Sequence, residues 1–88
     1  MTLQEQIRQG EDHVSTLIRA KATFRIDYIV WSGHTDTATS SILTIVAERQ
    51  KREYQFEDVR LQTYQHEDNQ RYFTQIVEQI VLDIENDT

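Results

Sequence analysis

The 88-residue sequence contains no cysteine and no proline, and only two glycines, Gly10 and Gly33. Without cysteine the chain can form no disulfide and has no thiolate metal ligand or cysteine nucleophile. Its stability must therefore come from packing or from a partner chain. Two isolated glycines are too few for a phosphate-binding loop of the usual kind. These absences exclude several common classes of functional site, and we expect no cofactor.

Long apolar runs are also missing. Fully apolar stretches such as residues 28–31 are far too short to span a membrane. Residues 1–6 lack the basic start and apolar run of a secretory signal. We therefore expect a cytoplasmic protein that does not bind membranes.

Basic residues are scarce towards the C-terminus of this acidic chain, whose net charge is −6. Residues 1–60 carry eight basic and nine acidic side chains, a balance of −1. Residues 61–88 carry one basic and six acidic side chains, a balance of −5. Affinity for nucleic acid comes largely from Lys and Arg on phosphates, so this distribution predicts no nucleic-acid partner.

The C-terminal residues have the clearest pattern. Apolar side chains recur there at i, i+1, i+4 and i+5, which is typical of an amphipathic helix. They are Tyr72, Phe73, Ile76, Val77, Ile80, Val81 and Ile84. Asp68 or Asn69 is suited to the N-cap position, and the pattern predicts a helix over residues 68–86.

The N-terminal residues allow two interpretations. Leu3, Ile7, Val14, Leu17 and Ile18 form a narrow stripe at helical spacing, interrupted at residue 10 by glycine. One helix through residue 20 explains the stripe, although an internal glycine costs about 1 kcal/mol relative to alanine. Alternatively, the helix ends at the glycine and a strand begins near residue 14. We favour the single helix.

Alternating and β-branched apolar residues in the middle of the chain predict β-strands. The first strand is predicted over residues 23–31, with Phe24, Ile26, Tyr28 and Val30 on one face. The second is predicted at about residues 41–49, and a third contains Tyr54 and ends or bulges near residues 57–58. Residues 50–52 form a charged reversal without glycine, which predicts a hairpin loop longer than two residues.

The fold class follows from this order. Composition and length indicate a single small α+β domain over residues 1–88. The element order is α-β-β-β-α, and consecutive strands with short connections pair most simply as an antiparallel meander. We expect this three-stranded meander to pack against one or two helices.

Surplus apolar positions decide the functional prediction. The second strand is apolar on both faces, Ile29 and Trp31 lie on the face opposite the main apolar set, and Leu82 lies about 100° beyond the apolar stripe of its helix. A monomer with this pattern would expose a large apolar patch. The sequence therefore predicts a non-catalytic protein-interaction module that forms a homodimer, with Ile29, Trp31 and Leu82 as partner-binding residues.

An alternative prediction depends on histidine. If the loop over residues 32–39 met the residues before the last helix, His34, Asp36 and His66 could form a carboxylate–imidazole group. Such a group could bind a small molecule or a metal, or could move a proton in an enzyme. The spacing matches no known metal-ligand signature. Exposed loop histidines, with no catalytic residue and no metal, are the simpler interpretation.

Overall fold

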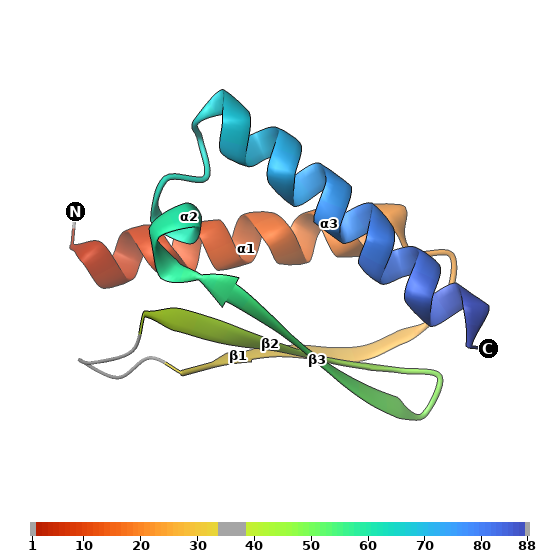
Figure 1. Ribbon diagram of the computed structural model, residues 1–88. Helices are drawn as coiled ribbons and strands as arrows, with labels where there is room; N and C mark the ends of the chain where they lie inside the picture. The colour runs from red at the N-terminus through yellow and green to blue at the C-terminus, as the bar shows by residue number, and fades with distance from the viewer. Residues whose placement is uncertain (1, 34–38, 88) are drawn as a thin grey trace.

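The computed structural model describes residues 2–33 and 39–87 (Figure 1). Its elements, in chain order, are α1 (Leu3–Lys21), β1 (Ile26–Ser32), β2 (Ser40–Ala47), β3 (Gln50–Glu57), α2 (Asp58–Gln62) and α3 (Glu67–Asn86). The three strands form one antiparallel sheet in the order β1-β2-β3. The predicted α+β class and three-stranded meander are confirmed.

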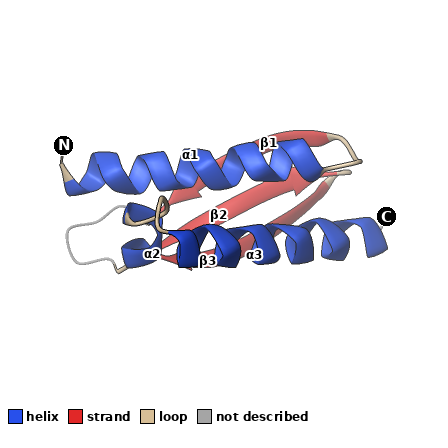
Figure 2. Cartoon of the chain, turned by 90° about the horizontal axis from the view of Figure 1, so that it is seen from above, coloured by secondary structure: helices blue, strands red, loops and turns tan. Residues whose placement is uncertain are grey.

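The helices form a single layer on one face of the sheet. Figure 1 shows α1 and α3 on the same side of the three strands, and Figure 2 shows them side by side above it. Helix α1 continues past Gly10 to Lys21, so the single-helix interpretation is confirmed. Its first turn is capped by Thr2, whose hydroxyl accepts a hydrogen bond from the Glu5 amide at 3.2 Å. Helix α3 matches the predicted range to within one residue at its start.

The face assignment predicted for β1 is wrong. The pairing of β1 with β2 shifts register between Ile26, which faces Ala47, and Tyr28, which faces Val46. A bulge of this kind inserts one residue and reverses the alternation of side chains that follow it. Ile26 therefore lies on the helix-covered face, whereas Tyr28 and Val30 lie on the opposite face. Sequence alternation alone carries no signal for the inserted residue, Asp27.

The hairpin prediction is also wrong. The loop between β2 and β3 has only two residues, Glu48 and Arg49, and both have positive φ, 51° and 66°. Two successive left-handed residues are the requirement of a type I′ turn, which usually selects Asn-Gly rather than Glu-Arg. The Glu48 carboxylate accepts a hydrogen bond from the Arg25 amide at 3.3 Å, which ties the turn to the residue preceding β1.

Gly10 lies at the contact between α1 and α2. A Cβ atom placed at Gly10 would lie 2.1 Å from the carbonyl oxygen of Leu61. The gap in the apolar stripe is thus the place where another backbone packs against the helix. The short helix α2 was not predicted. Its start is held by Ser41, whose buried hydroxyl donates to the Asp58 carboxylate at 2.6 Å.

The core lies between the helix layer and the sheet. Buried apolar side chains come from every element except β1, which contributes partly buried ones. The largest fully buried side chains are Phe56, Phe73, Ile18, Leu43, Ile45, Leu61 and Ile84. This packing covers one face of the sheet. The other face is not covered by any described element.

Candidate interaction surface

The sheet face opposite the helices is uncovered by any of the described residues (Figure 1). Paired residues in a sheet project to the same side, so the register assigns three cross-strand rows to this face. The rows are Tyr28, Val46 and Lys51; Val30, Thr44 and Glu53; and Ser32, Ile42 and Gln55. We refer to these nine residues as the open face.

The open face is apolar over two of its strands. Tyr28 is 49% exposed, Val30 48% and Ile42 37%, while Thr44 and Val46 of the central strand are half-buried between their neighbours. Scattered exposed apolar residues are normal on a protein surface, but adjacent ones on a flat sheet are typical of interaction sites. The exposed tyrosine adds an amphipathic ring of the kind enriched in interfaces.

The third strand gives the open face a polar margin. Lys51, Glu53 and Gln55 occupy its outward positions, and the Lys51 ammonium lies 3.3 Å from the Glu53 carboxylate. Both side chains are more than half exposed, so this ion pair contributes little to stability. The boundary between apolar and charged side chains on the open face therefore lies between β2 and β3.

The predicted partner-binding residues lie elsewhere. Ile29 and Trp31 are partly buried on the helix-covered face and pack against the core. The Trp31 ring lies 5.4 Å from that of Phe56, and its Nε1 donates to the Ser15 hydroxyl at 2.9 Å. Leu82 is 49% exposed on α3. The structure therefore does not gather the three residues on one exposed surface, and it presents Tyr28, Val30 and Ile42 instead.

The bulge explains why the open-face residues were not predicted as a site. With unbroken alternation, Tyr28 and Val30 belong to the core and Ile29 and Trp31 to the surface. Arg25 and Asp27 lie 3.3 Å apart at the bulge. In the sequence these two charged residues fit an unbroken alternation with Phe24 and Ile26, so they gave no sign of the inserted residue.

The alternative ligand site falls only partly within the structure. His34 and Asp36 lie outside the described residues, and His66 is exposed at the N-cap of α3, where its side chain makes no capping hydrogen bond. Within residues 2–33 and 39–87, no three His, Asp or Glu side chains are grouped closely enough to hold a metal ion.

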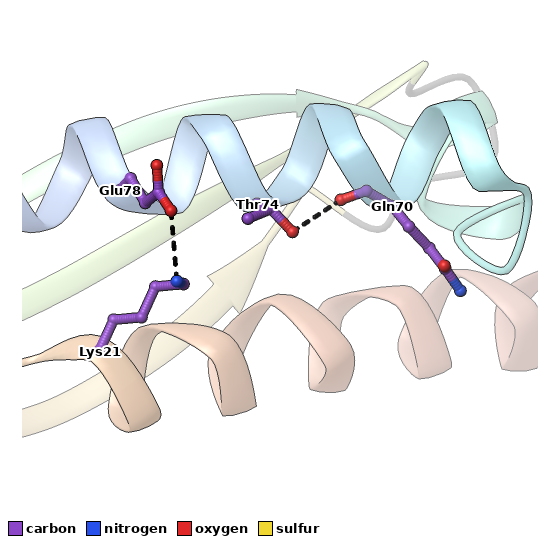
Figure 3. Close-up of polar contacts among 4 residues, drawn as sticks. All are labelled: Lys21, Gln70, Thr74 and Glu78. Carbon is purple, nitrogen blue, oxygen red and sulfur yellow. Dashed lines mark hydrogen bonds and ion pairs between the residues drawn. The ribbon is translucent and has the colours of Figure 1, made fainter.

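The helices are joined by polar contacts at their surface. Lys21 of α1 and Glu78 of α3 form an ion pair at 3.3 Å across the two helices, and Thr74 donates to the carbonyl of Gln70 at 2.9 Å (Figure 3). Exposed apolar side chains also occur on the helices, at Leu3, Val59 and Leu82. The open face differs in that its exposed apolar side chains lie on neighbouring strands of one sheet.

A polar hollow of about 410 Å³ lies where the C-terminal end of α3 meets β3. Arg52, whose guanidinium is paired with Asp87, and Tyr54 line it together with Asp83. Burial raises the pKa of Tyr54 above its ordinary value, the nearby Arg52 opposes the rise, and Asp83 adds to it. The hollow is wide open to solvent. Its Arg52 guanidinium is already paired with Asp87, so the guanidinium is not free to bind an anionic ligand.

Comparisons with known proteins identify no relative. No protein family, no curated protein and no solved structure matches this chain. None of the helices among the described residues is long and apolar enough to cross a membrane.

Proposed function

We propose that this chain is a non-catalytic protein-interaction module that self-associates as a dimer through the open face. The observation that supports the proposal is the run of exposed apolar side chains, Tyr28, Val30 and Ile42, on a sheet face that no described element covers. Packing against an equivalent face would remove these side chains from water. The cytoplasmic location remains a prediction from the sequence.

Electrostatics favours the open face over the helix layer as a self-contact. Helix α3 carries five acidic side chains and one basic one, so two copies that met through their helices would oppose like charges. On the open face, the paired outward positions of β1 and β2 carry no charge, and the charged side chains belong to β3 and to Asp27 at the bulge of β1, which lies 3.3 Å from Arg25. Two copies that met through this face would therefore oppose fewer like charges than two copies that met through α3.

The size of the face predicts a weak dimer. Three strands about 4.8 Å apart and seven residues long at about 3.3 Å each make a face of roughly 14 by 23 Å. Two such faces project to roughly 650 Å² in total, below the 1,200–2,000 Å² of accessible surface typical of stable interfaces. We therefore expect weak, reversible association.

Light scattering coupled to size exclusion, over a hundredfold range of concentration, tests the proposal. The mass is expected to rise from 10.5 kDa towards twice that value as concentration increases. Amide chemical shifts recorded over the same range should change in β1 and β2 and stay constant along the exposed side of α3. A mass of 10.5 kDa at every concentration would refute self-association, and concentration-dependent shifts confined to the helices would place the interface elsewhere.

A further inference from the structure

We draw no further inference here: the strongest candidate, the open face of the sheet around Tyr28, Val30 and Ile42, belongs to the surface already described, and nothing in the described part of the structure shows what covers it.

Discussion

At the scale of single residues, Gly10 does most to determine how the helices pack. It lies inside α1 where an apolar residue would continue the stripe, and the space that a side chain would need is filled by the backbone of Leu61. Backbone atoms within a helix cannot turn aside as a flexible side chain can. The residue is therefore required for a close approach between two helices rather than for a bend or a cap.

We expect Gly10→Ala to lower the free energy of unfolding by about 2 kcal/mol or more. Alanine improves helix propensity by about 1 kcal/mol, but its Cβ would lie 2.1 Å from the Leu61 carbonyl oxygen, so α2 must shift. Urea denaturation measures the change. The matched control is Thr16→Ala, at an exposed position of α1, which should change stability by less than about 0.5 kcal/mol. Equal effects of the two substitutions would show that α1 and α2 are not in close contact.

The sequence alone could not decide the role of Gly10. Its local pattern shows an interruption in a helical stripe, which a helix end and a close contact produce equally well. The residue that distinguishes them, Leu61, belongs to a short helix that has too few turns for a periodic signal. Sequence patterns report which face of an element is apolar, whereas they do not report which distant backbone that face meets.

At the scale of elements, the long helices and the strands were predictable and the connections were not. Helices α1 and α3 have enough turns for their apolar stripes to identify them, and the strands have β-branched, apolar segments. The bulge at Asp27 and the turn at Glu48 and Arg49 each depend on one or two residues whose types are not those usually found there. Because the bulge decides which side of β1 faces outward, Ile29 and Trp31 were predicted to face outward although they lie on the helix-covered side.

The hairpin between β2 and β3 provides a second prediction. Arg49 adopts a left-handed conformation, with φ 66°, at a cost of about 1–2 kcal/mol for a residue with a side chain. Arg49→Gly should therefore raise the free energy of unfolding by about 1 kcal/mol, since the relief of strain is partly offset by the greater freedom of glycine in the unfolded chain. Arg49→Ala removes the same charge but keeps the strain, so it should leave stability within about 0.5 kcal/mol of the wild type. Thermal or urea unfolding of the three proteins is the measurement, and a stabilisation by alanine equal to that by glycine would attribute the effect to charge.

At the scale of the whole molecule, the two surfaces of the protein differ in charge. The helix layer exposes Leu3, Val59 and Leu82 beside charged side chains such as the Lys21–Glu78 pair, and α3 concentrates negative charge there. The open face presents apolar side chains bordered by one charged strand. The sequence pattern predicted surplus apolar positions, and the charge distribution predicted the acidic C-terminal region. The separation of the two onto opposite sides depends on all helices packing on one face of the sheet, which no local pattern encodes.

This distribution of charge leads to the last prediction, that the protein does not bind duplex DNA or RNA. An extended cationic surface is needed to displace counterions from phosphates, and the exposed charge of α3 is predominantly negative. The basic residues near the hairpin are interspersed with acids, and two of them are already paired, Lys51 with Glu53 and Arg52 with Asp87. In a gel-shift assay at about 100 mM salt, we expect no complex with a random-sequence duplex at about 10 μM protein, within the range of nonspecific affinities. A basic duplex-binding protein in the same assay serves as the positive control. A complex that weakens steeply as salt rises would show that the protein has a cationic surface able to engage phosphates, and would contradict the prediction.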